Sequence, residues 1–265
     1  MTQLLFCFCV QIIPTIGTTI LLGFLVALCN RSFYSNVGSL NRGICFITGF
    51  IGTPVHELAH ALFCVIFGHK IVEIKLYQPN SEDGVLGYVN HSYNPKNLYH
   101  RIGNFFIGVA PIVVISALLY LLARFMIPDL MQIVSIYLND LDPLKGIDSV
   151  IFGFRGLLAA AIGFFKDPMW WLFILLGSSL SLHMTLSGAD IKGAISGIAF
   201  LLVSVLSVDV ILYFFSIETM FAVTRFVMKI SGFYNLFLLM GLLTSAFVLL
   251  ISVMVKVAIK KKVRR

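Results

Sequence analysis

The segment GTPVHELAHALF, residues 52–63, places two histidines and a glutamate in an otherwise apolar stretch. His56 and His60 are four residues apart, so on a helix their imidazoles share one face. Two imidazoles in this arrangement can bind one zinc ion, and Glu57 beside them is the general base of the HExxH pattern. Ionisable groups are costly inside a membrane helix and are retained mainly where they function. The pattern therefore predicts a catalytic metal site.

A third ligand must come from elsewhere in the chain, because a catalytic zinc takes three protein ligands and leaves a fourth position for water. The segment SLHMTLSGADIKGA, residues 181–194, offers His183, Ser187 and Asp190. Their spacing of i, i+4 and i+7 predicts one stripe of a membrane helix. We expect Asp190 to complete the site. His183 is the alternative ligand, or a group beside the metal that orients a ligand or stabilises the oxyanion. Ser187 is likewise either such a neighbouring group or an alternative ligand.

The chain that carries these residues is too apolar for a water-soluble fold. Of its 265 residues, 59% are hydrophobic and 12% are charged, against roughly 45–50% and about 25% in soluble domains. The excess apolar surface could not be buried in a soluble core of this size. We therefore expect an all-α polytopic membrane protein with one integral-membrane domain, residues 1–265.

Apolar segments long enough to cross a bilayer, about 20 residues, divide the chain. Two shorter or more mixed stretches, 150–165 and 217–231, suit helices lying at the interface or re-entering the bilayer better than full spans. Asp209, inside one apolar segment, is expected to reach the membrane interface or, if deeper, to pair with a base or face a polar cavity. The six expected spans are about 4–29, 44–68, 103–127, 169–189, 193–215 and 233–257.

The most polar internal region is the loop 69–102, directly after the HExxH helix. HKIVEIKLYQ and GVLGYVNHSY are rich in β-branched and aromatic residues, and PNSEDG between them is a run of turn formers. This pattern predicts a small β-hairpin. His69, His91 and His100 fall in this loop, where we expect them to be solvated.

The positions of the basic residues indicate how the chain lies in a membrane and do not indicate a nucleic-acid partner. The formal net charge is +7, and six of the 19 lysines and arginines lie in residues 256–265. A basic block after an apolar segment marks the cytoplasmic side of a membrane helix and attracts anionic lipid. We therefore expect the lipid bilayer as a partner, a cytoplasmic C-terminal tail and no nucleic-acid binding.

The motif HELAHALF in a membrane helix, followed by an aspartate on a later membrane helix, resembles the site-2 protease family of intramembrane zinc metalloproteases. GNFFIGVAPIVV, residues 103–114, is similar to the helix that follows the hairpin in that family. The resemblance covers about residues 44–200. SGADIKG stands where many members carry Asn-Pro-Asp-Gly or Leu-Asp-Gly, and a PDZ-like insertion is absent. The chain thus resembles a divergent branch.

The resemblance implies one zinc ion per chain held by His56, His60 and Asp190, with Glu57 as general base. The substrate would be a membrane protein or peptide, and the compact chain suggests a bacterial plasma membrane. Two readings from other classes stay open: a membrane transporter that binds a cation through the same residues, and a non-catalytic scaffold stabilised by zinc. Neither needs Glu57 as a base.

Overall fold

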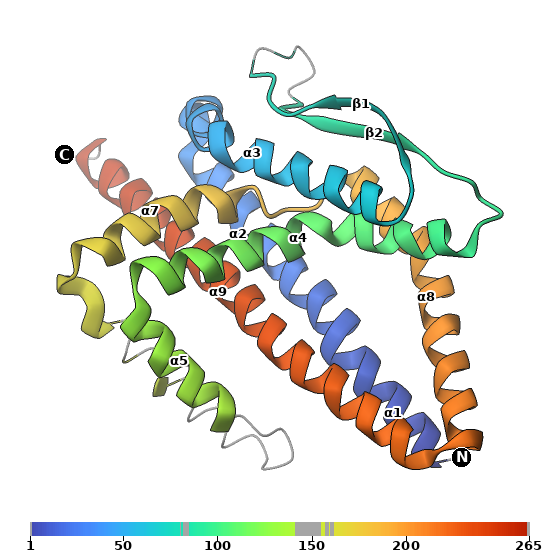
Figure 1. Ribbon diagram of the computed structural model, residues 1–265. Coiled ribbons are helices and arrows are strands. Elements are labelled where there is room, and N and C mark those ends of the chain that lie inside the picture. The colour runs from blue at the N-terminus through green and yellow to red at the C-terminus, as the bar shows by residue number, and fades with distance from the viewer. Residues whose placement is uncertain are drawn as a thin grey trace.

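The structure, a computed structural model, is built almost entirely from apolar helices (Figure 1). It describes residues 2–79, 81, 85–140, 155–156, 159 and 162–263. Within these, four helices are long and apolar enough to cross a membrane, and two shorter apolar helices accompany them. The four are Thr2–Val37, Gly43–Ile66, Leu98–Met126 and Gly188–Phe215, and the shorter two are Pro168–Leu182 and Gly241–Val257.

The predicted all-α membrane fold is confirmed. Each expected span overlaps one of these helices, but those expected at 169–189 and 233–257 correspond only to the two shorter helices. In chain order the helices are α1 (Thr2–Ile12), a π-helical turn (Ile13–Gly17), α2 (Thr18–Val37), a 3-10 turn (Gly38–Leu40), α3 (Asn41–Ile66), α4 (Leu98–Met126), α5 (Pro128–Asp140), a 3-10 turn (Phe164–Lys166), α7 (Pro168–Leu182), α8 (Gly188–Phe215) and α9 (Ile217–Val263).

Residues 217–231 do not form a helix of their own, although the expected spans implied one. These residues form the first part of α9, a single helix of 47 residues, about 70 Å long at a rise of 1.5 Å per residue. The charged positions that suggested an interface are exposed on this helix, as at Arg225 and Lys229, so the helix continues through them without a break. Most of 150–165 lies outside the described residues.

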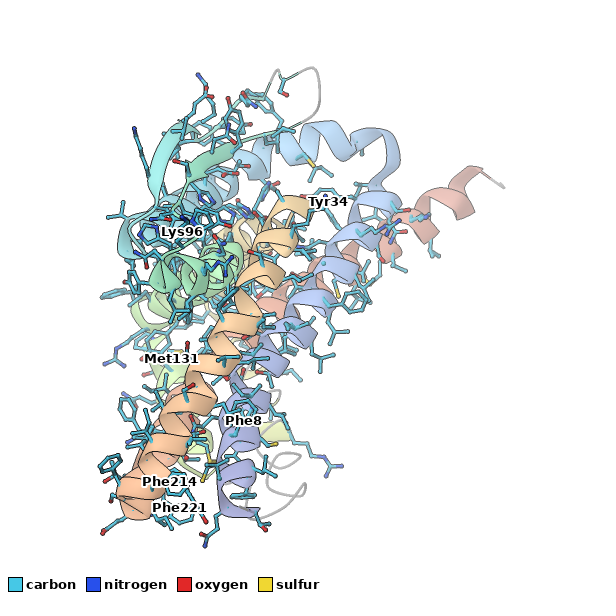
Figure 2. All side chains as sticks on the ribbon, turned by 90° about the vertical axis from the view of Figure 1, so that its right-hand side faces the viewer. Phe8, Tyr34, Lys96, Met131, Phe214 and Phe221 are labelled. Carbon is cyan, nitrogen blue, oxygen red and sulfur yellow. The ribbon has the colours of Figure 1, made fainter. Side chains whose placement is uncertain are left out.

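The predicted hairpin is present and lies against α3. Strand β1 (Lys70–Lys75) pairs antiparallel with β2 (Tyr88–Ser92), with an irregularity between Ile71 and Glu73. Figure 1 shows the hairpin along one side of α3, and α8 running away from it to meet the start of α9 near α1. In the turned view of Figure 2, Lys96 lies at the hairpin end, whereas Phe214 and Phe221 lie at the opposite end.

Helix α4 is the centre around which the site is assembled. Ile112, Ile115 and Leu119 are buried and pack with residues of α2, α7 and α9. On another side, Gly108 lets α8 approach closely, because a Cβ atom there would lie 2.5 Å from the backbone oxygen of Asp190. Small residues allow membrane helices to pack backbone against backbone. Gly108 therefore fixes how near the start of α8 comes to α4.

Candidate metal centre

The two histidines of the motif lie one turn apart on α3, and each is oriented by a backbone carbonyl. His60 Nδ1 is 2.8 Å from the carbonyl oxygen of Ile107 on α4, and His56 Nδ1 is 2.7 Å from that of His183. A carbonyl only accepts hydrogen bonds, so both Nδ1 atoms carry the proton and donate. Both Nε2 atoms therefore present lone pairs, and they lie 3.1 Å apart.

Asp190 supplies the third side chain, from the first turn of α8. Its Oδ1 lies 3.2 Å from His60 Nε2 and its Oδ2 lies 3.8 Å from His56 Nε2. One ligand atom from each of the three residues falls within 4.8 Å of the others. Two segments more than a hundred residues apart thus converge on one point.

Ser187 orients this carboxylate by capping α8. The backbone N–H of Ser187 donates to Asp190 Oδ2 at 2.6 Å, and the backbone N–H of Asp190 donates to Ser187 Oγ at 3.2 Å. This reciprocal capping box satisfies donors at the helix start. It also leaves the carboxylate turned toward the two imidazoles, which is the orienting role expected for Ser187.

The donor set fits a bound cation. Two imidazole lone pairs and a carboxylate face one another, and the protons that could separate them are already donated to carbonyls. With both rings neutral, no proton lies between these three acceptors, and either a metal cation or a proton on one Nε2 would relieve their repulsion. Imidazole and carboxylate are ligands that zinc takes in catalytic sites of three protein ligands. A zinc ion is therefore compatible with this group of residues.

The prediction that His183, Ser187 and Asp190 share one helical stripe was wrong. Helix α7 ends at Leu182 and α8 begins at Gly188, and residues 183–187 between them are not helical. The ring of His183 turns back to the carbonyl of Ser179 at 3.1 Å. His183 therefore contributes its backbone oxygen to His56, and its imidazole is outside the His56–His60–Asp190 group.

Glu57 lies beside His56 with 6% of its surface exposed, and the hairpin passes directly over it. A Cβ atom at Gly87 would lie 2.8 Å from Glu57 Cγ and 2.9 Å from the backbone oxygen of Lys75. Only glycine permits this approach. Gly87 could not be predicted as a site residue from its sequence neighbours, because nothing local marks it as a contact of α3.

Of the three histidines expected to be solvated, His69 is buried, whereas His91 and His100 are partly exposed. His69 is 5% exposed; its Nδ1 contacts His91 Nδ1 at 3.0 Å, and its Nε2 donates to the carbonyl of His100 at 2.9 Å. Burial lowers the pKa of both His69 and His91 below the ordinary value. The pair is thus held neutral and ties β2 to the end of α3 and the start of α4.

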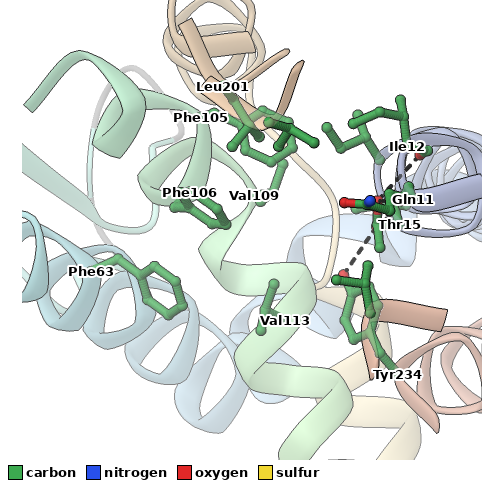
Figure 3. Close-up of a pocket in the computed structure, with 14 residues that line it drawn as sticks. Gln11, Ile12, Thr15, Phe63, Phe105, Phe106, Val109, Val113, Leu201 and Tyr234 are labelled. Atoms are coloured by element: carbon green, nitrogen blue, oxygen red, sulfur yellow. Dashed lines mark hydrogen bonds between the residues drawn. The ribbon is translucent and has the colours of Figure 1, made fainter. Parts of the chain in front are cut away.

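A mostly apolar cavity of about 420 Å³ opens among six helices near the site (Figure 3). Phe63, one turn beyond His60, and Val109 of α4 line it together with Leu201 of α8 and Tyr234 of α9. Gln11 of α1 adds an amide to a wall whose other polar groups are the hydroxyls of Thr15, Thr19 and Tyr234. The cavity has the size and character to accept apolar side chains.

A second buried polar cluster lies further along α8. Asp209 is 1% exposed, so the expectation that it reaches the membrane interface was wrong. Its Oδ1 accepts a hydrogen bond of 2.9 Å from Gln11 Nε2, which also lies 3.0 Å from Thr224 Oγ1. The partner is a neutral amide on α1, and this pairing could not be read from the spacing of either residue.

Comparison with known proteins bears on α3, the hairpin and α4. Residues 49–139 match a family described as "Putative zincin peptidase"; the matched segment contains His56, Glu57 and His60, but Asp190 lies beyond it. Searches of curated proteins and of solved structures found no match. Together with the convergent His, His and Asp side chains, the match supports a zinc metallopeptidase family for this chain.

Proposed function

We propose that this protein is an intramembrane zinc metalloprotease of the site-2 protease type, acting on membrane-embedded or membrane-proximal proteins. The observation that carries the proposal is the convergence of His56, His60 and Asp190 beside Glu57, on helices apolar enough to span a membrane. We place the enzyme in a bacterial plasma membrane with its C-terminus on the cytoplasmic side, from the basic tail.

The residues of the site have two roles in peptide hydrolysis, metal binding and proton transfer. The chemistry that a zinc ion supplies in such a site is Lewis acidity, which acidifies water and polarises a carbonyl. His56, His60 and Asp190 would hold it. Glu57 takes the proton of the attacking water on its carboxylate and later gives it to the leaving amine. Its low exposure keeps bulk water from competing for this proton.

The hairpin supports a route for presenting the substrate. A membrane helix offers no free carbonyl, because its backbone is internally hydrogen-bonded, so the substrate must unwind locally. An unwound segment can add to the edge of a sheet as an extra strand. Because Gly87 precedes β2 and contacts Glu57, a strand added at this edge would run close to the general base. The cavity beside Phe63 could receive its apolar side chains.

Replacement of Glu57 by Gln tests the catalytic assignment. The general base should be lost without loss of the metal ligands, so cleavage should fall about 10²–10⁴-fold while the purified protein keeps one zinc per chain. Quantitative membrane proteomics of cells carrying Glu57→Gln should show uncut transmembrane substrates accumulating. Glu218→Gln, at the exposed start of α9, is the matched control and should cleave normally.

The outcomes separate this proposal from its alternatives. Metal-dependent transport that survives Glu57→Gln would favour a transporter. Unaltered membrane proteomes, together with unfolding on metal removal, would favour a zinc-stabilised scaffold. Purified wild-type protein without stoichiometric zinc would exclude the metalloprotease.

Gly87→Ala tests the part given to the hairpin. The added methyl group must displace either Glu57 or the backbone of Lys75, and overpacking of this kind costs about 1–3 kcal/mol. We expect cleavage to fall roughly tenfold or more while zinc content stays at one per chain. Gly43→Ala, where a Cβ atom meets nothing within 4 Å, is the control on α3. Full activity in Gly87→Ala would argue against presentation of the substrate at this edge.

A further inference from the structure

The short junction between α7 and α8, residues 183–187, positions two ligands of the metal centre, the His56 ring and the Asp190 carboxylate. The carbonyl of His183, its first residue, accepts the Nδ1 proton of His56, and Ser187, its last, orients Asp190. A shift of this junction would therefore turn one imidazole and move the carboxylate. What holds the junction in place decides whether the three ligand atoms converge.

One side of the junction is held by α3 itself. Ser179 Oγ donates to the carbonyl of Thr48 at 3.0 Å, and a Cβ atom at Gly52 would clash with the ring of His183. The His183 ring therefore packs directly on the backbone of α3. This contact fixes how close the junction comes to His56, but packing alone does not fix how far it slides along α3.

The other side is held by one polar side chain of α2. Asn30 is 1% exposed, and its Nδ2 donates to the carbonyls of Ser181 at 2.9 Å and Leu182 at 3.3 Å. These are the last two residues of α7, whose carbonyls lack the usual partner four residues on. The next carbonyl along the chain is that of His183. Asn30 therefore hydrogen-bonds to the two backbone carbonyls immediately before the His183 carbonyl, which orients the ring of His56.

We infer that Asn30 is a positioning residue for the metal centre. It acts through the end of α7, holding the His183 carbonyl where it keeps the proton of His56 on Nδ1 and the lone pair on Nε2. The inference rests on the proposed zinc site and extends it to α2, beyond the 49–139 segment that matches the peptidase family. Groups that orient a metal ligand through its second nitrogen commonly change metal affinity 10–100-fold when removed.

The test compares two asparagines on the same helix. Asn30→Leu removes both hydrogen bonds at similar volume. Asn36→Leu is the matched control, because Asn36 also bonds across helices, to Ser252 at 3.2 Å and from Lys256 at 2.8 Å, but contacts α9 instead of α7. For each full-length variant in detergent we would measure zinc affinity by chelator competition, the absorption spectrum of the cobalt-substituted protein, and the Tm.

We expect the two variants to differ in zinc affinity and in the cobalt spectrum. Asn30→Leu should bind zinc about 10–100-fold more weakly and alter the cobalt spectrum, whereas Asn36→Leu should stay within about threefold of wild type whatever its Tm. Asn30→Ser keeps one hydrogen-bond donor, so its zinc affinity should lie between those of wild type and Asn30→Leu. This variant replaces Asn30→Leu in the test if the leucine variant does not fold. Wild-type zinc affinity in either folded Asn30 variant, or equal weakening in Asn36→Leu, would overturn the inference. A wild-type protein that binds no zinc would instead overturn the proposed function.

Discussion

Helix α8 carries two aspartates in buried polar clusters, and their surroundings differ in kind. Asp190 faces two imidazole nitrogens whose protons are already donated elsewhere. Asp209 faces the amide of Gln11, which donates to it. The first cluster brings metal-ligating atoms of three residues together, and its carboxylate also accepts the backbone N–H of Ser187. In the second, one amide donates to Asp209 Oδ1, and Oδ2 has no hydrogen-bond partner among the described residues.

This difference separates a functional site from a structural one. Buried polar groups cost free energy unless they are hydrogen-bonded. The Gln11 amide satisfies Oδ1 of Asp209 and joins α1 to α8, while Oδ2 has no hydrogen-bond partner among the described residues. At Asp190 the backbone N–H of Ser187 already donates to Oδ2, and a bound cation would join the carboxylate to the two imidazoles. Burial of a carboxylate in a membrane helix is therefore weak evidence of function; the convergence of several metal-ligating side chains is the stronger criterion.

The largest effect expected from this comparison is on zinc binding. Asp190→Asn replaces an anionic ligand by a neutral amide and should weaken zinc binding more than 100-fold, beyond the 10–100-fold loss typical of groups that only orient ligands. Asp209→Asn keeps the oxygen that accepts from Gln11 and should leave zinc affinity unchanged. Chelator competition on both purified variants measures this, and equal losses would break the distinction.

A smaller effect is expected on stability, and only at the second cluster. Gln11→Leu leaves the Asp209 carboxyl buried without its donor, which should lower the free energy of unfolding by about 1–3 kcal/mol. Thermal unfolding in detergent would show this as a lower Tm. Zinc affinity should stay at the wild-type value, since about 28 Å of helix separates the two aspartates at 1.5 Å per residue.

Two controls sharpen the stability prediction. The double variant Gln11→Leu/Asp209→Leu removes donor and acceptor together and should recover most of the loss, because replacing both partners by apolar groups can be nearly neutral. Removal of zinc by a chelator should lower the Tm of wild type and Gln11→Leu by similar amounts. A chelator effect that disappears in Gln11→Leu would mean that the two clusters act as one.

Local patterns predicted much of this architecture. The apolar runs predicted the helices, turn formers between β-branched segments predicted the hairpin, and the spacing of His56 and His60 predicted that both rings face one point. Asp190 was also expected near them, but for a mistaken reason. The helical periodicity that selected it does not exist across residues 183–187.

The sequence by itself determined the membrane solvent, the helices and the HExxH pair, because each depends on residues within a few turns of one another. Only the tertiary structure decided which carboxylate joins the histidines. Gly108 brings α8 against α4, Asn30 holds the end of α7, and Gly87 lets the hairpin reach Glu57. These contacts join segments far apart in the chain, and their free energy depends on close packing and matched donors that no local pattern encodes.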